Sequence, residues 1–434
     1  MMTYRSRRYW LLVKDKVQDV FLRNVVSTFI VSVLSLMISV ATSVIIARVL
    51  GPEKKGIISL AILMPSVLGL LLNGGISVSN VYFISSKKFD IKSLSANSIT
   101  FFILFTVLGG FFLAGLFLTG WIHIILPDIP SWAILLSLAI FPFGLLSTFL
   151  SGLIQGLEQI VSLNRIQLIQ SGLILLLTVL MVLVFHLDLF GALIASLLAA
   201  IAGSIGFSIY LRKQGAIFRP KWDGAVVRAS LSFGLRGYIA NVLQYFNYRL
   251  DVFIVNYYLG PTAVGIYAVS YGIAELLWYL PNAVSFAVYP RVSANRHTKT
   301  NWSTLKTLWI TSAITILGGV LMAIFGRWLI KILFGDPFIS AYLPLLAILP
   351  GVIALGASKV LAADIAGRGY PQYNSIISGI GLIVTIAADL ILIPMLGVLG
   401  ASSASSISYV VLLLLSIGYY HGILRRLPNK CVNY

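Results

Sequence analysis

The chain has 434 residues, of which 59% are hydrophobic and only 10% are charged, and its formal net charge is +18 at pH 7. In soluble globular proteins about a quarter of the residues are charged, so this composition excludes an ordinary soluble domain and indicates an integral membrane protein. The single cysteine, Cys431, excludes a disulfide framework within the chain.

Apolar runs of roughly 20 residues, the length that crosses a bilayer, recur along the whole sequence. We predict twelve membrane-spanning helices, and therefore an all-α integral membrane fold. The spans are expected at residues 25–47, 57–84, 98–120, 131–153, 166–186, 189–211, 231–258, 265–288, 307–333, 340–363, 374–395 and 400–423. Because their number is even, both termini lie on the same side of the membrane.

Polar segments divide these spans into two lobes of six. The first lobe is expected at residues 25–211 and the second at 229–424, joined by a cytoplasmic linker at 212–228. A basic amphipathic segment at 1–24 precedes them on the inner membrane face, and a cytoplasmic tail at 425–434 follows. With the termini placed inside, 23 of the 31 Lys and Arg residues fall in inner segments and 5 in outer ones. This asymmetry follows the positive-inside rule. We therefore predict a multi-pass protein of the cytoplasmic (inner) membrane with both termini cytoplasmic, and no nucleic-acid partner.

The two lobes repeat each other at a constant offset of 209 residues, from Gly51 to Gly260. Leu50-Gly51-Pro52 with Gly56 recurs as Leu259-Gly260-Pro261 with Gly265, and we expect each copy to form a tight structural turn. Six spans per lobe make the repeat parallel. A bilayer protein built from two like halves is typical of a transporter, with the substrate path in a central cavity between the halves.

Two stretches of the first half, 44–57 and 72–76, resemble the opening of polysaccharide flippases, and residues 251–255, 259–261 and 264–267 resemble their second half. These flippases, which include O-antigen and other lipid-linked oligosaccharide flippases, form a branch of the multidrug, oligosaccharidyl-lipid and polysaccharide exporter superfamily. Twelve spans match this branch, whereas the lipid II flippase branch usually carries fourteen. The resemblance implies a two-lobed helical bundle around a central cavity.

The same resemblance implies a function. It predicts that the chain flips an undecaprenyl-pyrophosphate-linked oligosaccharide from the cytoplasmic to the outer leaflet by alternating access, for surface polysaccharide assembly. It makes a polysaccharide polymerase and a chain-length regulator candidate partners. No cofactor or metal is expected, and a gradient of H⁺ or Na⁺ is the candidate driving force.

Two other functions are open to the sequence. A cation-coupled exporter of drugs or other small molecules would have the same fold, and carboxylates in the second half would serve its coupling. The basic groups in the interior suit an anionic headgroup better than a cationic drug. An enzyme is the third alternative, but the sequence lacks a nucleophile–base pair, a metal-ligand spacing and a phosphate-binding glycine loop. We predict that the chain is not an enzyme.

Ionisable residues inside the predicted spans are concentrated in the second half, and none has a charged residue at the repeat-related position. Each costs about 2.5 kcal/mol or more on insertion, so such residues are functional candidates. The candidates for binding a pyrophosphate or sugar headgroup are Arg236, Arg249, Lys359, Asn241, Gln244, Tyr248 and Arg48. The candidates for ion coupling or a structural ion pair are Asp251, Glu275, Asp364 and Asp389.

Helical spacing separates the roles of two of these charges. Arg249 and Asp251 are two positions apart, roughly 200° around a helix, so they face different partners. We predict that Arg249 pairs with Glu275 or Asp389.

Several of these candidates keep an alternative structural role. Arg236 suits a pyrophosphate or snorkels to the inner interface, and Arg48 lines the cavity or anchors the outer turn. Asp364 is also consistent with a span end in contact with water. Gln244 and Tyr248 share a helix face at i, i+4, a pairing of amide and aromatic ring that suits sugars.

Overall fold

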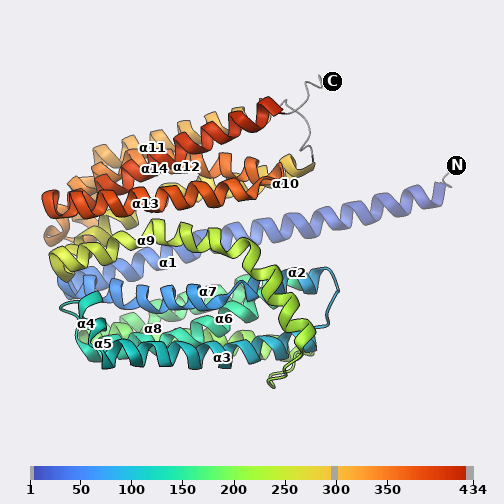
Figure 1. The fold of residues 1–434 in the computed structure, drawn as a ribbon, viewed down its shortest axis with the longest axis horizontal. Helices are drawn as coiled ribbons and strands as arrows, with labels where there is room; N and C mark the ends of the chain where they lie inside the picture. Colours follow the sequence, from blue (N-terminus) through green and yellow to red (C-terminus); the bar gives the residue numbers. More distant parts are fainter. Residues whose placement is uncertain (1–3, 295–301, 427–434) are drawn as a thin grey trace. The chain divides into compact units, whose positions relative to one another are not determined.

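The computed structural model describes residues 4–294 and 302–426, without the side chains of residues 4–26, 236, 237, 290, 294, 302, 303 and 426. Within this part of the chain every regular element is a helix (Figure 1), which confirms the predicted all-α class. Ten of the described helical segments are long and apolar enough to cross a membrane. The two longest, Ser27–Asn73 and Tyr238–Ser293, each pass through a non-helical glycine and each cover two predicted spans. The chain is therefore a multi-pass membrane protein.

The chain divides into two compact units that interleave along the sequence. Unit 1 comprises Met1–Val49, Leu63–Leu113 and Ser131–Arg236. Unit 2 comprises Leu50–Ile62, Ala114–Pro130 and Gly237–Tyr434. Two short segments of the first sequence repeat therefore pack in unit 2. The bounds of the two lobes predicted from the repeat stay a prediction.

Unit 1 has an interior without buried charge among its described side chains. It contains most of α1 (Tyr4–Asn73), α2 (Ile76–Ser85), α3 (Ile91–Leu118), α5 (Ser131–Leu138), α6 (Ile140–Gly156), α7 (Ile160–Thr178), the π-helix η1 (Val179–Val184), α8 (Asp188–Lys213) and the start of α9 (Gly224–Glu275). Its buried polar groups are neutral, and some of them form hydrogen bonds between helices. Asn80, for example, donates to the Ser98 hydroxyl at 2.8 Å and to the Phe149 carbonyl at 3.2 Å.

Unit 2 differs because charged side chains are buried inside it. Its helices are α4 (Trp121–Ile125), the rest of α9, the 3₁₀ turn η2 (Leu276–Trp278), α10 (Tyr279–Ala294), α11 (Trp302–Phe334), the 3₁₀ turn η3 (Asp336–Ala341), α12 (Tyr342–Gly367), α13 (Pro371–Leu396) and α14 (Val398–Arg426). Helix α14 packs along both α12 and α13, and the three lie side by side in Figure 1. The buried charged residues of unit 2 are Lys55, Asp251, Asp364, Arg368 and Asp389.

The repeated Leu-Gly-Pro motif forms the same backbone kink in both halves. Gly51, inside α1, has φ 77° and ψ 179°, and Gly260, inside α9, has φ 76° and ψ 178°. Residues with a side chain rarely adopt such angles, and the following prolines cannot continue a regular helix from the preceding turn. The predicted structural turns are therefore present, as matching kinks that each separate two spans.

The second glycine of each motif packs against the other motif, within unit 2. A Cβ atom on Gly56 would overlap the carbonyl oxygen of Pro261, and a Cβ atom on Gly265 would overlap the carbonyl oxygen of Pro52. We call this reciprocal contact of four residues the glycine crossing. Close backbone approach of this kind is the usual role of small residues between membrane helices.

Candidate functional site

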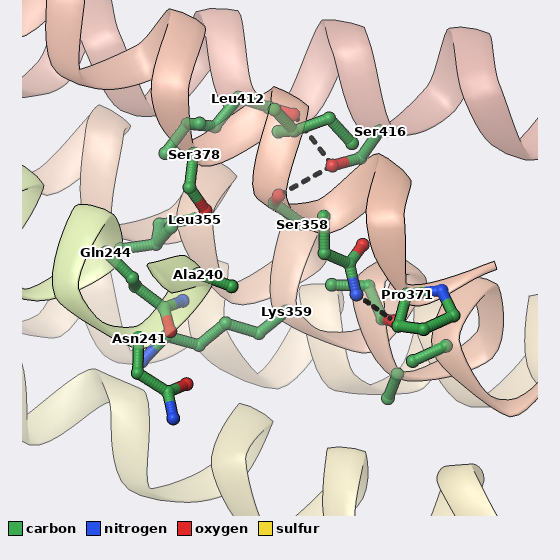
Figure 2. A pocket seen from close by; sticks show the side chains of 15 residues that line it. Ala240, Asn241, Gln244, Leu355, Ser358, Lys359, Pro371, Ser378, Leu412 and Ser416 are labelled. Atoms are coloured by element: carbon green, nitrogen blue, oxygen red, sulfur yellow. Dashed lines mark hydrogen bonds between the residues drawn. The ribbon is translucent and has the colours of Figure 1, made fainter. Parts of the chain in front are cut away.

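A cavity of about 360 Å³ lies in unit 2, between α9, α12, α13 and α14. Lys359 is the one ionisable residue among those that line it, and amides contribute from Asn241, Gln244 and Asn374. Figure 2 shows Lys359 on α12 extending toward the part of the wall that Asn241 and Gln244 of α9 form. The remaining lining is aliphatic or carries small hydroxyls. The cavity therefore offers one positive charge with amides beside it.

Hydrogen bonds within the wall hold its helices together while leaving the amides accessible. The Ser358 and Ser416 hydroxyls, on α12 and α14, are 2.9 Å apart, and Asn374 of α13 donates to an α12 carbonyl at 2.9 Å. The Gln244 amide donates to the Tyr248 hydroxyl at 2.9 Å. Asn241 and Gln244 are both exposed, so a molecule in the cavity can reach them. Three of the predicted headgroup residues thus line one cavity.

The ammonium group of Lys359 is held by neutral partners. It donates to the Asn282 side-chain oxygen at 3.0 Å and lies 4.3 Å from the centre of the Trp278 ring and 5.4 Å from that of Tyr248. These partners come from α10, η2 and α9. Ring faces attract a cation without neutralising it. The Lys359 ammonium group is therefore held in place by neutral partners and keeps its positive charge.

The predicted pair of Arg249 and Glu275 is present. The Arg249 Nη2 atom lies 3.4 Å from each carboxylate oxygen of Glu275, and its guanidinium lies 4.5 Å from the centre of the Tyr271 ring. The Tyr271 hydroxyl donates to Glu275 Oε1 at 2.5 Å. Asp389, the other predicted partner, forms no salt bridge with Arg249 among the described residues. Glu275 thus has one partner a helical turn before it, Tyr271, and a second, Arg249, from the part of α9 before the kink at Gly260.

Asp251 points elsewhere, as its spacing from Arg249 predicts. It is 1% exposed and accepts hydrogen bonds from the Tyr267 hydroxyl, from the Ser405 hydroxyl at 3.1 Å and from the Val252 amide at 2.8 Å. Hydrogen bonds to a buried carboxylate offset part of the cost of removing it from water. Asp251 is therefore the centre of a small polar site between α9 and α14.

A neutral layer lies one helical turn from this carboxylate. Asn247 accepts a hydrogen bond from Thr385 at 2.7 Å and one from Ser408 at 3.3 Å, joining α9, α13 and α14. Asp251 and Asp389 each lie four residues beyond a member of this layer, on α9 and α13, so both project from the same helix faces as the layer does. The two carboxylates therefore lie one helical turn from the neutral layer, where α9, α13 and α14 pack together.

Asp389 is the least compensated group of unit 2. Its side chain is 0% exposed, and neither carboxylate oxygen has a hydrogen-bond partner among the described residues. Asp251 is the charged group whose field acts on it. A buried carboxylate without a hydrogen-bond partner is very costly in its charged form, which makes Asp389 a candidate for holding a proton or a cation. Among the described residues, no cluster of three or more His, Cys, Asp or Glu side chains is arranged to hold a metal ion.

The remaining predicted residues lie outside these two sites. Asp364 is fully buried and paired with Arg368, the residue that follows the end of α12, so the two form a buried ion pair and Asp364 does not contact water. Arg48 is exposed on α1 in unit 1, with an interaction partner of its own. The side chain of Arg236 and residues 427–434 of the predicted tail lie outside the described residues.

Sequence reasoning missed several partners of the charged groups. Arg368 stands four residues after Asp364, a spacing that signals an ion pair on a helix, but it lies between the predicted spans 340–363 and 374–395. The serine-rich stretch 402–408 on α14 indicated a polar helix face, but the sequence did not show which residue this face contacts. Asn282, which follows a proline in an apolar segment, carried no such signal.

Comparison with known proteins places these features in a family. The family model of polysaccharide biosynthesis proteins matches residues 21–296, and the MatE family model matches residues 238–391. A protein of Shigella flexneri named as an O-antigen transporter is 24% identical over 391 residues, covering 86% of this chain and 91% of its own length. A Haloferax volcanii protein named as a low-salt glycan biosynthesis flippase is 21% identical over 224 residues, 51% of this chain and 47% of its own.

Solved structures share the fold. The lipid II flippase MurJ in an inward closed conformation has a TM-score of 0.75 at 15% identity, covering 94% of this chain and 88% of that one. An inward-facing multidrug resistance transporter of the MATE family has a TM-score of 0.70 at 15% identity, covering 90% of this chain and 94% of that one. The resemblance seen in the Leu-Gly-Pro motifs is thereby confirmed. The family model of polysaccharide biosynthesis proteins matches well over half of the chain, and the chain therefore belongs to that family.

Proposed function

We propose that the chain moves an oligosaccharide linked to undecaprenyl pyrophosphate from the cytoplasmic to the outer leaflet by alternating access, for surface polysaccharide assembly. The observation that carries the proposal is the cavity whose one ionisable lining residue, Lys359, is basic and stands beside the amides of Asn241 and Gln244. A phosphate is held well by a cation with hydrogen-bond donors around it, and amides bond to sugar hydroxyls in both directions. Family membership and the names of the relatives support the same substrate class.

Replacing Lys359 by glutamine is expected to slow the transfer of a lipid-linked oligosaccharide at least about tenfold, since a hydrogen bond to a charged group contributes about 1.5–3 kcal/mol. Glutamine keeps a polar end on a side chain one atom shorter, so the effect chiefly reports the lost charge. Purified protein in proteoliposomes with a fluorescent undecaprenyl-pyrophosphate oligosaccharide measures it, because transferred sugar becomes accessible to a lectin outside the vesicle.

Lys331→Gln is the matched control. Lys331 is also a lysine of unit 2, but it is 59% exposed and pairs with the exposed Asp336 at 3.1 Å. A surface pair of this kind contributes little, so transfer is expected to stay at the wild-type rate. Equal loss in both variants, or wild-type transfer by Lys359→Gln, would contradict the proposed role of the cavity.

We also propose that Asp251 and Asp389 couple transport to a gradient of H⁺ or Na⁺. Support comes from the burial of Asp389, from its two unpartnered oxygens and from the second carboxylate whose field acts on it. A site that must hold a proton or a monovalent cation to remain buried is suited to exchange that ion when the cavity opens to the other side. The buried ion pair of Asp364 is already neutralised and has no such role.

A cation-coupled exporter of small molecules is the second candidate function. The MatE match over residues 238–391 favours it, since these residues hold both Asp251 and Asp389. Lys359 argues against a cationic cargo, which it would repel. Vesicles distinguish the two functions: efflux of an organic cation together with no transfer of lipid-linked sugar would support the exporter.

The remaining features of the proposal concern topology and partners. We place both termini in the cytoplasm of a cell with an inner membrane, because the basic residues are concentrated in the segments on that side. A polysaccharide polymerase and a chain-length regulator are the proposed protein partners, since they would use the transferred sugar. Transfer between leaflets makes and breaks no covalent bond, and we propose that the chain is not an enzyme.

A further inference from the structure

Two cations share one aromatic cluster in unit 2, but only one of them is paired with a carboxylate. Arg249 lies over Tyr271 and binds Glu275, whereas Lys359 lies over Trp278. The Tyr271 and Trp278 rings are themselves in contact, with centres 6.1 Å apart. Within the described part of the chain, Lys359 forms no salt bridge. Lys359 is half-exposed and lines the cavity, so a cation without a protein counter-ion stands where an anion entering the cavity can reach it.

Glu275 is the carboxylate that could neutralise Lys359. It lies three residues before Trp278, whose ring the ammonium group covers, and its charge acts on Lys359 as well as on Arg249. Both of its oxygens are nevertheless engaged on the other side. Arg249 Nη2 lies 3.4 Å from each of them, and the Tyr271 hydroxyl lies 2.5 Å from Oε1. Among the described residues Glu275 is paired with Arg249 and forms no salt bridge with Lys359.

We propose that Arg249 is a positioning residue that holds Glu275 away from Lys359, so that the uncompensated Lys359 ammonium is free to bind the diphosphate of an isoprenyl-linked substrate. Arg249 does not itself touch the substrate. This inference rests on the proposed function and assigns different roles to two residues that the sequence analysis grouped as headgroup candidates. Trp278 and Asn282 complete the arrangement, because they orient the ammonium without cancelling its charge.

A double-mutant cycle tests the role of Arg249. Farnesyl diphosphate is the probe, and its dissociation constant is measured with the purified full-length chain in lipid nanodiscs. In Arg249→Gln the freed Glu275 is expected to pair with Lys359, and affinity is expected to fall about tenfold, a coupling typical of contacting charges. Glu275→Gln, which removes the competing carboxylate, is expected to bind at least as tightly as the wild-type chain. The double variant Arg249→Gln/Glu275→Gln is expected to recover the wild-type affinity.

The recovery is the decisive result, because a residue in direct contact with the diphosphate could not be restored by removing Glu275. Affinity in the double variant that stays as weak as in Arg249→Gln would overturn the inference. Arg249→Lys, which keeps a charge for Glu275, is expected to bind within about twofold of wild type on the same reasoning; a loss as large as that of Arg249→Gln would also overturn it. Farnesol, which has no charge, is expected to bind all variants alike.

The same experiment separates this inference from the proposed function. If the wild-type chain binds farnesyl diphosphate no better than farnesol, the proposed substrate class is wrong, and the role of Arg249 is overturned with it. If the wild-type chain binds the diphosphate but the double variant shows no recovery, the substrate class stands and only the role of Arg249 is wrong. Thermal unfolding of each variant in the same nanodiscs verifies that affinities are compared between folded proteins.

Discussion

An Asp389→Asn variant is expected to fold and insert like the wild-type chain but to lose gradient-driven transport. The carboxyl group is fully buried, lies in the field of Asp251 and has no hydrogen-bond partner for either oxygen among the described residues. It must therefore carry a proton or hold a cation in the packed state. An amide has the same shape and no charge, so it fills the site without exchanging an ion. Transport that is coupled through this group would then no longer respond to the gradient.

Proteoliposomes with a pH gradient or a sodium gradient, imposed separately, measure this effect as the ratio of driven to undriven transfer. For the wild-type chain, the gradient that gives a ratio above one identifies the coupling ion. For Asp389→Asn, the ratio is expected to be one with either gradient. Asp336→Asn is the control, because that carboxylate is 72% exposed and its pair with Lys331 lies at the surface. A ratio in Asp389→Asn equal to that of the wild-type chain would show that Asp389 has no part in coupling.

Replacing Gly56 by alanine is expected to lower the free energy of unfolding by about 1–3 kcal/mol, the usual cost of overfilling a close contact. The added methyl group would overlap the carbonyl oxygen of Pro261, and a backbone atom cannot rotate away as a side chain can. Gly265→Ala is expected to have the same effect, through Pro52, because the contact is reciprocal. Thermal unfolding of the detergent-purified chain, followed by tryptophan fluorescence, measures both variants.

Gly110→Ala is the matched control for the glycine crossing. Gly110 is also a glycine inside a membrane helix, α3, but a Cβ atom there would have no other atom within 4 Å. Alanine also favours helix over glycine by roughly 1 kcal/mol, so this variant is expected to be as stable as the wild-type chain or more so. Should Gly56→Ala and Gly110→Ala unfold at the same temperature, the glycine crossing would not be a tight contact.

Much of the fold was predictable because the membrane dictates it. Backbone groups in lipid must be satisfied within each segment, so apolar length and turn residues suffice to predict the helices. The Leu-Gly-Pro motifs predicted the kinks at Gly51 and Gly260 because Gly and Pro act locally. The pair of Arg249 and Glu275 was predictable for a similar reason, since both are charged, lie in adjacent spans and have few possible partners.

The arrangement around Lys359 could not be predicted in the same way. Its partners Tyr248, Trp278 and Asn282 come from three elements, and whether they meet depends on how each helix is rotated about its axis. The hydropathy pattern predicts this rotation poorly, because a helix in the interior of a membrane protein is apolar on most of its faces. That Asp389 lacks a hydrogen-bond partner could not be predicted from the sequence either, because this depends on which side chains of the neighbouring helices face it.

The interleaving of the two units has a consequence for biosynthesis. Residues 50–62 and 114–130 pack in unit 2, most of which is formed by residues 237–434. These two early segments are synthesised before most of their packing partners exist, so unit 2 cannot be completed until the second half has entered the membrane. Domains usually fold in order from the N-terminus during synthesis. Here residues 50–62 and 114–130 enter the membrane before most of their contacts can form, and a second half expressed without the first would lack these segments of unit 2.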